Sequence, residues 1–572
     1  DIKPNTENAV KKLGLKFKPS PLLAGIVKTV ENEKKESPWL YDDDDDDGKQ
    51  VESHNKQSAQ GGNTNNSNNN NYDPLIREVS SKLLKNYNKV KKTKKYHEMI
   101  RQRSRLPAYS MREDIIQIIL NNQVVVISGE TGCGKTTQVP QIVLDWMIEN
   151  NKGALCNMIC TQPRRISAIG VADRIASERV ERVGETVGYQ IRLETRRSAK
   201  TRLLFCTTGV LLRRLQCDPD LKGVSHIFVD EIHERDLSTD FLLIILRGLI
   251  KKRPNLHLVL MSATLNALMF AEYFASSTYG APAPIVEIPG RAFPVKDYYL
   301  EDALEITGHK IEPQSDCAKK VDTRKKRNNN KSSGGGEQKE RPVLNKKQLR
   351  KKFPELSNDT LRSLSMVDEE IINYELIEEL IKHIAATTKE GAILCFLPGL
   401  MEIQTLYEQL NLIAEEHNLE VYPLHSSLST MEQKAVFNHP ENGLRKVVVS
   451  TNIAETSITI DDVIYVIDAG RVKENRYDHE KNMAQLVETW VSLASAKQRR
   501  GRAGRVQPGI CYHLFSTMTK EVLSEYTMPE MHRVPLHEMV LQIKVLDLLD
   551  GDAATFLGQA VTPPDETAIN TA

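Results

Sequence analysis

One segment of the chain has the residue types and spacing to hold a phosphate group: Gly129-Glu130-Thr131-Gly132-Cys133-Gly134-Lys135-Thr136. It follows a short apolar run and opens an amphipathic stretch, which is the context that a phosphate-binding loop requires. Glycines let backbone N–H groups turn toward the phosphates, and the N-terminus of the following helix adds positive potential. Lys135 would contact the β- and γ-phosphates, and the Thr136 hydroxyl would bind Mg²⁺. The segment therefore predicts a nucleoside triphosphate site.

Two adjacent carboxylates, Asp230 and Glu231, directly follow the apolar run 227–229, and Ile232 and His233 come next. A carboxylate at the end of a strand opposite a phosphate loop is well placed to hold Mg²⁺, and a second one can deprotonate water. We therefore expect Asp230 on the metal side and Glu231 as the general base. In isolation such a pair could be a cap or a surface feature, but the upstream phosphate loop favours the catalytic interpretation.

An arginine-rich segment near the C-terminal end is a third candidate: Gln498-Arg499-Arg500-Gly501-Arg502-Ala503-Gly504-Arg505. Helical spacing would place Arg502 and Arg505 on one face, three positions apart. Phosphoryl transfer needs positive charge on the γ-phosphate as its negative charge develops, which is the role of an arginine finger. A basic surface patch that binds RNA is the alternative, and it remains open for Arg499 and Arg500.

Two shorter motifs suit a nucleic-acid backbone: Thr161-Gln162-Pro163-Arg164-Arg165 and Thr207-Thr208-Gly209. Both follow apolar runs, so their polar groups should emerge where strands end. Hydroxyl, guanidinium and backbone N–H contacts to phosphate position a strand without reading its sequence.

The elements that must position these groups are short apolar runs alternating with amphipathic segments. This alternation is typical of βαβ units, in which a parallel sheet is covered by helices on both faces. The expected strands are 124–128, 158–161, 202–207, 226–229 and 256–262 in one block, and 392–396, 420–423, 446–451 and 463–468 in a second. Residues 506–572 are expected to be helical.

Composition limits the class of protein. The 572 residues carry 77 Lys+Arg against 76 Asp+Glu, a net charge of +1, with 40% hydrophobic residues. These values exclude a wholly disordered chain and a chain that binds polyanions through bulk charge. No run approaches the roughly 18 apolar residues of a membrane span, and no secretory signal is visible. The eight cysteines form no CxxC pair, which favours a reducing compartment, expected to be the cytoplasm, with the nucleus possible.

Two regions stand apart from the α/β blocks. An acidic run at 42–47 and a Gly/Asn/Ser tract at 61–71 predict a disordered N-terminal region. Residues 74–105 read as a basic helix, either a solvated face or a contact for nucleic acid or a ribosome.

The motifs occur in an order that resembles the DEAH-box (DEAH/RNA helicase A) family of superfamily 2 helicases. The matching segments are GETGCGKT (129–136), TQPRRISA (161–168), TTG (207–209), DEIH (230–233), SAT (262–264), FLPG (396–399), STNIAETSITID (450–461) and QRRGRAGR (498–505). The resemblance covers about three-quarters of the chain and implies an α/β fold with two tandem RecA-like domains. A disordered N-terminal region and a partial, helical winged-helix-like C-terminus would flank them.

The resemblance also implies a division of the chain and an enzyme mechanism. The implied segments are a disordered region 1–73, a basic helix 74–105, an ATP-binding domain 106–294, a connector with an insertion 295–368, a second domain 369–530 and a truncated winged-helix-like start 531–572. Family members hydrolyse ATP with Mg²⁺ and move 3′ to 5′ on RNA, and other NTPs should also be accepted. A remodeller or RNA clamp without processive unwinding is the alternative, because its motifs are identical.

Individual roles follow from matching positions. Catalysis is assigned to Asp230, Glu231, His233, Gln498, Arg502 and Arg505, and coupling of nucleotide state to domain movement to Ser262 and Thr264. The nucleotide is assigned the whole phosphate loop together with Arg174, Phe437, Ser457 and Asp461, with adenine stacked between Arg174 and Phe437. The RNA backbone is assigned Arg164, Arg165, Thr207, Gly290, Arg291, Gly399, Thr451 and Thr459. A strand-separating β-hairpin is expected within 471–489. Expected partners are RNA and, in addition, ribosomal or ribonucleoprotein components, with no membrane contact and an oligomeric state left open.

Overall fold

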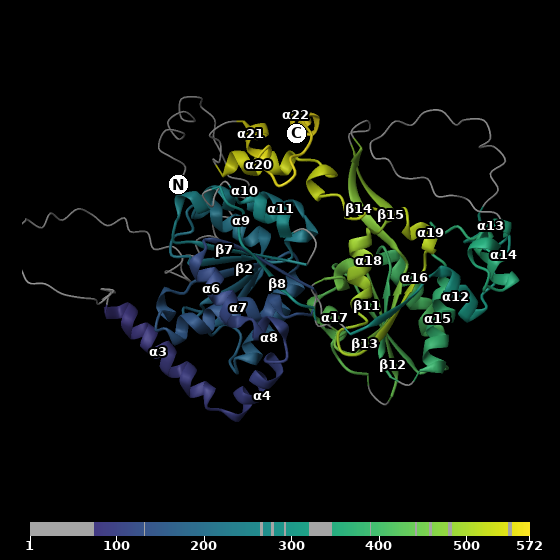
Figure 1. Ribbon diagram of the computed structural model, residues 1–572, viewed down its shortest axis with the longest axis horizontal. Helices are drawn as coiled ribbons and strands as arrows, with labels where there is room; N and C mark the ends of the chain where they lie inside the picture. The colour runs from purple at the N-terminus through teal and green to yellow at the C-terminus, as the bar shows by residue number, and fades with distance from the viewer. Residues whose placement is uncertain are drawn as a thin grey trace, which may run out of the picture.

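The computed structural model describes residues 74–130, 132–263, 267–275, 280–290, 293–319, 346–388, 390–440, 443–456, 460–478, 483–546 and 552–572. Within these residues the chain forms two α/β domains that lie side by side, each built on its own sheet (Figure 1). The prediction of two tandem domains with parallel sheets flanked by helices is therefore confirmed. The predicted disordered region 1–73 lies outside the described residues.

The first domain is built on an eight-stranded sheet in the order β4-β3-β5-β2-β6-β7-β1-β8. Every neighbouring pair is parallel except β3 with β4. The strands are β1 (Val124–Gly129), β2 (Met158–Gln162), β3 (Val187–Ile191), β4 (Glu194–Arg196), β5 (Leu203–Thr207), β6 (His226–Val229), β7 (His257–Ser262) and β8 (Ile285–Ile288). The sequence predicted the five central strands but missed β3, β4 and β8, which lie toward the two edges.

Helices cover both faces of this sheet, so its central strands are buried on both sides, as expected for a parallel sheet. In β1, Val124 and Val126 belong to one hydrophobic core cluster, and Val125 and Ile127 belong to another. The helices are α5 (Pro107–Ser110), α6 (Arg112–Asn121), α7 (Lys135–Glu149), α8 (Arg165–Glu178), α9 (Thr208–Cys217), α10 (Leu237–Lys252) and α11 (Ala267–Tyr273). Side chains of α9, α10 and α11 fill the first cluster, and those of α6, α7 and α8 fill the second.

The second domain is built on a six-stranded parallel sheet in the order β11-β12-β10-β13-β16-β9. Its strands are β9 (Val295–Tyr298), β10 (Ala392–Phe396), β11 (Leu419–Leu424), β12 (Arg445–Ser450), β13 (Val463–Asp468) and β16 (Gly509–His513). Its helices are α12 (Leu300–Thr307), α13 (Lys346–Lys352), α14 (Asn358–Met366), α15 (Tyr374–Thr387), α16 (Leu400–Ile413), α17 (Thr430–Ala435), α18 (Leu493–Arg500) and α19 (Thr517–Lys520).

Two sequence predictions for this domain are wrong. The segment 295–368 is not only a connector, because β9 at its start pairs with β16 and completes the second sheet. Residues 506–572 are not uniformly helical, because β16 is a buried strand of that sheet. Both strands are short and contain polar residues such as Asp297 and His513, so their apolar pattern is weak and their pairing arises only in the tertiary fold.

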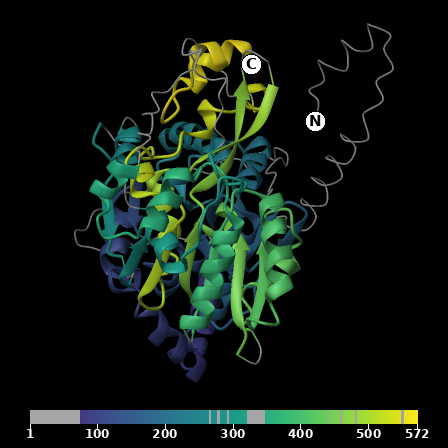
Figure 2. The same cartoon turned by 90° about the vertical axis from the view of Figure 1, so that its right-hand side faces the viewer.

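Three further parts attach to the domains. The predicted hairpin is formed by β14 (Arg471–Asp478) and β15 (Met483–Trp490), which pair only with each other and project from the second domain (Figures 1 and 2). The helices α3 (Pro74–Lys91) and α4 (Lys94–Arg103) pack on the first domain. The helices α20 (His537–Val545), α21 (Ala553–Leu557) and α22 (Glu566–Thr571) also contribute side chains to the core of the first domain. None of the described helices is both long and apolar enough to cross a membrane.

Candidate nucleotide site between the two domains

The phosphate loop connects β1 to α7 at the carboxyl edge of the first sheet, as predicted. Gly134 is the residue before the helix and has a φ of 92°, a left-handed conformation that side-chain-bearing residues rarely adopt. A Cβ atom at Gly134 would also lie 3.2 Å from the side chain of Leu106. The backbone N–H groups at the start of α7 therefore face the loop, as a phosphate site requires. Thr131 lies outside the described residues.

Lys135 is the first residue of α7 and points into a buried cluster of charges. Its side chain is only 4% exposed, and its Nζ lies 3.4 Å from a carboxylate oxygen of Glu231. Burial opposes the charged form, but the carboxylates of Glu231 and Asp230 outweigh it and raise the pKa of Lys135 above its usual value. The lysine is therefore a fixed positive charge at the mouth of the phosphate loop.

Asp230 is held in one orientation at the end of β6. The Gln162 side chain donates a hydrogen bond of 2.8 Å to one carboxylate oxygen, and the backbone N–H of Glu231 donates one of 2.9 Å to the other. Burial and the neighbouring charge of Glu231 raise the pKa of Asp230 to about 6, despite Lys135 and a hydrogen bond from Thr136. A cation beside Asp230 and Thr136 would remove this penalty, and carboxylate and hydroxyl oxygens are ligands that Mg²⁺ prefers.

Glu231 has the features of a poised base. Its backbone has a φ of 54°, which is rare for a residue with a side chain and typical of functional positions. Burial favours the neutral acid, but Lys135 and Arg502 lower the pKa of Glu231, so the carboxylate is ionised at neutral pH. Within the described residues, its buried Oε2 has no hydrogen-bond partner. That oxygen is available to accept a proton from a water molecule.

His233 connects this cluster to the end of β7. It lies in the short 3₁₀ helix Ile232–Glu234, and its Nδ1 accepts a hydrogen bond of 3.1 Å from the backbone N–H of Ala263. Burial lowers the pKa of His233, so the ring is neutral and its Nδ1 can act as the acceptor. Ser262, the last residue of β7, is fully buried. The predicted coupling residue Thr264 lies outside the described residues.

Arg502 and Arg505 reach the site from the second domain, although the predicted helix that would carry them is wrong. Helix α18 ends at Arg500, and residues 501–507 form turns, in which Gly501 and Gly504 do not sustain a helix. Arg502 donates to the backbone carbonyls of Glu455 and Thr456. Burial lowers the pKa of Arg505 to about 10, and the charge of Glu231 opposes this shift in both arginines. The arginines of one domain therefore interact with the base of the other.

A bridge of side chains joins the two domains beside this cluster. Glu234 accepts a hydrogen bond of 2.5 Å from the hydroxyl of Thr456 and one of 3.4 Å from Arg164. Arg164 also donates to the carbonyl of Asn452 over 2.8 Å. Glu234 was assigned no role from the sequence. The only signal that could have suggested one is its position directly after Asp230-Glu231-Ile232-His233. The bridge ties the end of β6 to the segment after β12.

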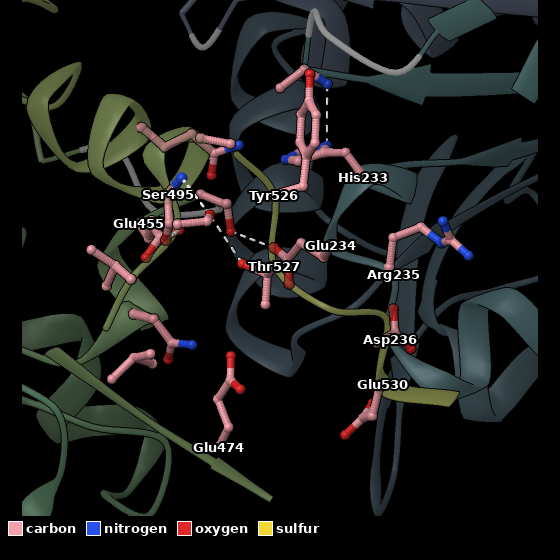
Figure 3. Close-up of a pocket in the computed structure, with 18 of the residues that line it drawn as sticks. His233, Glu234, Arg235, Asp236, Glu455, Glu474, Ser495, Tyr526, Thr527 and Glu530 are labelled. Carbon is pink, nitrogen blue, oxygen red and sulfur yellow. Dashed lines mark hydrogen bonds between the residues drawn. The ribbon is translucent and has the colours of Figure 1, made fainter. Parts of the chain in front are cut away.

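A cavity of about 590 Å³ lies next to this bridge, between the two domains. In Figure 3, His233 to Asp236 line it from the first domain and Glu455 and Ser495 line it from the second. Gln498 also lines it, as does Glu474 of the hairpin, and the segment containing Thr527 and Glu530 runs between the domains. The cavity therefore joins the nucleotide cluster to the base of the hairpin.

That C-terminal segment is a connection that the sequence did not predict. Glu530 binds the first domain, where its backbone N–H donates to the Arg235 carbonyl and its carboxylate accepts from the Leu237 N–H. Three residues later, Arg533 bonds the hairpin through Asn475 and Tyr477. The segment thus links the residues after Glu231 to the hairpin of the other domain.

The described residues that were predicted to bind RNA lie where strands of the two sheets end. Arg164 and Arg165 begin α8 after β2, Thr207 caps α9 after β5, Gly399 precedes α16 after β10, and Thr451 follows β12. Gly290 follows β8, where a Cβ atom would lie 2.2 Å from the Glu130 carboxylate. Arg291 and Thr459 lie outside the described residues.

The predicted adenine contacts stay a prediction. The Arg174 guanidinium is half-exposed on α8 and donates a hydrogen bond of 2.8 Å to Glu178. Phe437 lies on the second domain and is 42% exposed. Asp461 is exposed, and its charge acts on Arg505. Ser457 lies outside the described residues.

Comparison with known proteins agrees with this geometry. Residues 109–270 match the model of the DEAD/DEAH box helicase, and residues 374–507 match the helicase conserved C-terminal domain. The chain belongs to the DEAD/DEAH-box helicases. The two matched segments hold the two halves of the candidate site, with Lys135 and Glu231 in the first and Arg502 and Arg505 in the second.

Three relatives place this helicase chain among DEAH/DExH proteins. It is 44% identical over 517 residues to the human "Putative ATP-dependent RNA helicase DHX57", covering 85% of this chain and 37% of the relative. It is 46% identical over 504 residues to the Arabidopsis thaliana "DExH-box ATP-dependent RNA helicase DExH1", covering 87% and 50%. It is 45% identical over 499 residues to the Bos taurus "ATP-dependent DNA/RNA helicase DHX36", covering 86% and 48%. The chain thus spans half or less of the length of each of these relatives.

Proposed function

We propose that this chain is the motor of an ATP-dependent RNA helicase, an RNA-stimulated NTPase that hydrolyses ATP to ADP and phosphate. The observation that carries the proposal is the split site: Lys135 and Glu231 belong to one domain, and Arg502 and Arg505 reach them from the other. Each group matches a requirement of phosphoryl transfer: a cation on the phosphates, a base for water and arginines for the transition state. The relatives named as ATP-dependent RNA helicases support the same reaction.

In the proposed reaction, Lys135 and the N–H groups of the loop hold the β- and γ-phosphates. The ionised carboxylate of Glu231 takes a proton from water through its buried Oε2, and the water oxygen attacks the γ-phosphorus. The bond from that phosphorus to the β–γ bridging oxygen breaks, and ADP departs with the electron pair. Asp230 and Thr136 would hold Mg²⁺, which would neutralise charge on the same phosphates. Arg502 and Arg505 would stabilise the charge that develops on the γ-phosphoryl group.

Coupling of ATP hydrolysis to RNA binding follows from the division of the site between the two domains. The predicted backbone contacts lie on both domains, with Arg164 and Thr207 on the first and Gly399 and Thr451 on the second. An RNA strand that bridges them would favour the closed arrangement, in which the arginines and the base meet. Hydrolysis removes the γ-phosphate link and favours opening. Glu234 belongs to this closure, because it bonds both Arg164 and Thr456.

The cycle could drive either of two activities: unwinding of duplexes, or remodelling of RNA–protein complexes without processive unwinding. The hairpin favours unwinding, because it lines the cavity and is linked to the first domain through the segment that contains Glu530 and Arg533. Strand displacement with RNA duplexes that carry either a 3′ or a 5′ overhang tests the choice. We expect ATP-dependent displacement from the 3′ overhang only. ATP hydrolysis stimulated by RNA but without displacement from either substrate would favour the remodeller.

The location and partners are part of the same proposal. All eight cysteines are free thiols in the structure, which suits a reducing compartment such as the cytoplasm or the nucleus. RNA is the proposed partner, because the residues at the strand ends would bind its phosphate backbone without sequence preference. Contacts with ribosomal or ribonucleoprotein components would depend on which complex contains the bound RNA.

A further inference from the structure

The helices α3 and α4 carry a concentration of positive charge that the nucleotide site does not use. Residues 74–105 contain eleven basic and two acidic residues, a net charge of +9, whereas the whole chain has a net charge of +1. Along α3, Lys82, Lys85 and Lys89 follow one another at intervals of three and four positions, and Lys92 continues the series. This spacing places them along one side of the helix. We call this surface the α3–α4 basic face, made of Lys82, Lys85, Lys89, Lys92, Lys94, Lys95 and Arg101.

The other side of α3 is anchored to the first domain. The hydroxyl of Ser80 accepts a hydrogen bond of 3.0 Å from the Ala154 N–H, and the buried hydroxyls of Tyr87 and Tyr96 lie 3.1 Å apart. Leu84 and Val90 pack against the core of the first domain. The helix therefore cannot rotate to bury its lysines, and the basic face is fixed toward solvent.

Most of these charges have no ion-pair partner among the described residues. Lys82 pairs with the exposed Glu78, and the inward-facing Lys91 pairs with Glu149. In the part of the chain that the structure describes, the other lysines of the face form no ion pair with a carboxylate. Five exposed, unneutralised lysines on two consecutive helices repel each other, and a polyanion that neutralised them would bind with release of its counterions.

The face lies far from the proposed path of RNA between the domains. Lys91 contacts Glu149 at the last turn of α7, whereas the phosphate loop is at the first turn. The basic face is therefore near the amino edge of the first sheet, and Arg164 and Thr207 are at its carboxyl edge. In Figure 1, α3 and α4 lie at the outer, lower corner of the first domain, away from the hairpin and the second domain.

We propose that the α3–α4 basic face is an accessory RNA-binding surface that holds the phosphate backbone of an RNA segment outside the path between the domains. The proposal rests on the proposed function, because it takes RNA as the ligand. Lysines are point charges that bind phosphate without geometric selectivity, so binding here is independent of sequence. Tyr87 and Tyr96 are buried, so the face offers no aromatic platform from these two for stacking unpaired bases. The surface therefore suits duplex or structured RNA, whose phosphates are exposed and whose bases are paired.

The test compares two variants that lose the same number of charges. One replaces Lys85, Lys89, Lys92 and Lys95 with Gln. The control replaces four exposed lysines of α13 with Gln, on the far side of the second domain: Lys346, Lys347, Lys351 and Lys352. Affinity for a hairpin RNA with a single-stranded tail is measured against salt concentration for the unmodified chain and for both variants. Circular dichroism and thermal unfolding check that all three are equally folded.

We expect the α3–α4 variant to bind RNA more weakly, with the slope of log affinity against log salt smaller by about 2 to 3 in magnitude, since each phosphate contact contributes about 0.7 to 0.9. The α13 variant should lose clearly less RNA affinity, and its slope should change clearly less. Equal slopes for the unmodified chain and the α3–α4 variant would overturn the accessory surface. So would equal losses in both variants, or a loss of binding to anionic lipid vesicles without any loss for RNA. Failure of the unmodified chain to bind RNA or to hydrolyse ATP faster with it would instead overturn the proposed function itself.

Discussion

Each domain has a strand that lies between two parallel neighbours and leads through a short loop into a helix, and the two domains use this connection differently. In the first, β1 lies between β7 and β8 and leads through residues 130–134 into α7. In the second, β10 lies between β12 and β13 and leads through residues 397–399 into α16. The first connection ends in a left-handed Gly134 and a buried Lys135, whereas the second ends in an extended Gly399, with Leu400 as the first helical residue. Only the first can surround a phosphate.

The buried carboxylates of the two domains differ in the same way. Burial and Glu231 raise the pKa of Asp230 to about 6 in the first domain, so its charge lacks full compensation within the protein. In the second domain, Arg499 and His513 overcome burial and lower the pKa of Asp468 to about 2. The carboxylate of Asp230 in the first domain is therefore available to a cationic ligand, whereas Asp468 in the second domain is paired with Arg499. The second domain also directs Arg502 and Arg505 toward Glu231 of the first. The difference agrees with the proposed split site, in which the base Glu231 and the arginines Arg502 and Arg505 lie on different domains.

The largest expected effect comes from removing an arginine that crosses between the domains. Arg505→Ala should lower kcat for ATP hydrolysis by about 10³-fold, the usual contribution of an arginine finger, because the developing charge on the γ-phosphoryl group loses its cation. Affinity for a fluorescent ATP analogue should change far less, since the phosphate loop is intact. Arg500→Ala is the matched control, because that side chain is directed to Asp297 instead. If Arg505→Ala weakens RNA binding and leaves turnover unchanged, Arg505 is an RNA contact.

The second prediction concerns the internally paired carboxylate of the second domain. Asp468→Asn should lower the free energy of unfolding by about 3 kcal/mol near pH 7, because it breaks the buried ion pair with Arg499, which then keeps only Glu455 as an ion-pair partner among the described residues. Since the pKa of Asp468 is lowered on folding, its stabilisation is present above about pH 4 and is lost as the pH falls toward 2. Thermal unfolding across this range measures it. An unchanged melting temperature near pH 7 would mean that the ion pair does not stabilise the domain.

A smaller effect is expected at the bridge between the domains. Glu234→Gln should lower the RNA-stimulated rate of ATP hydrolysis by about tenfold, since a hydrogen bond to a charged group contributes about 1.5 to 3 kcal/mol. The amide keeps the size of the side chain but weakens its bonds with Arg164 and Thr456. The concentration of RNA that gives half-maximal stimulation should rise as well. Equal loss of the basal and the stimulated rates would show that Glu234 acts in the chemical step and not in closure.

The smallest expected effect has the opposite sign. Asp236 caps α10 through the Thr239 N–H, and burial raises its pKa to about 6. Asp236→Asn keeps a capping oxygen and removes the ionised group, so it should stabilise the chain by about 1 kcal/mol near neutral pH. Because the pKa is raised on folding, the penalty is present above pH 6 and is relieved as the pH falls toward 4, so the gain should vanish there. Asp552→Asn, at an exposed cap with a lowered pKa, should give no gain.

The sequence predicted where the main site residues lie along the strands better than the way in which the fold brings the two domains together. Lys135, Asp230 and Glu231 could be found because a phosphate loop and a carboxylate pair each follow a strongly apolar strand. Helical spacing misplaced Arg502 and Arg505, since α18 stops at Arg500. The strands β9 and β16 were not predicted because their apolar pattern is weak.

The bridge and the C-terminal segment could not be predicted at all. Glu234 meets Thr456, and Arg533 meets Asn475, only because residues far apart in the sequence come together in space. No local pattern carries that information. The same holds for the basic face, where the sequence showed the lysines but not which side of α3 is buried.

The most direct test of the split site is the steady-state rate of ATP hydrolysis by this chain, with and without single-stranded RNA, beside Glu231→Gln. We expect RNA to stimulate the unmodified chain. We also expect Glu231→Gln to bind ATP as the unmodified chain does and to lose turnover by about 10²-fold, within the usual contribution of a general base. Normal turnover in Glu231→Gln would contradict the account, because the base on which both domains converge would not be needed.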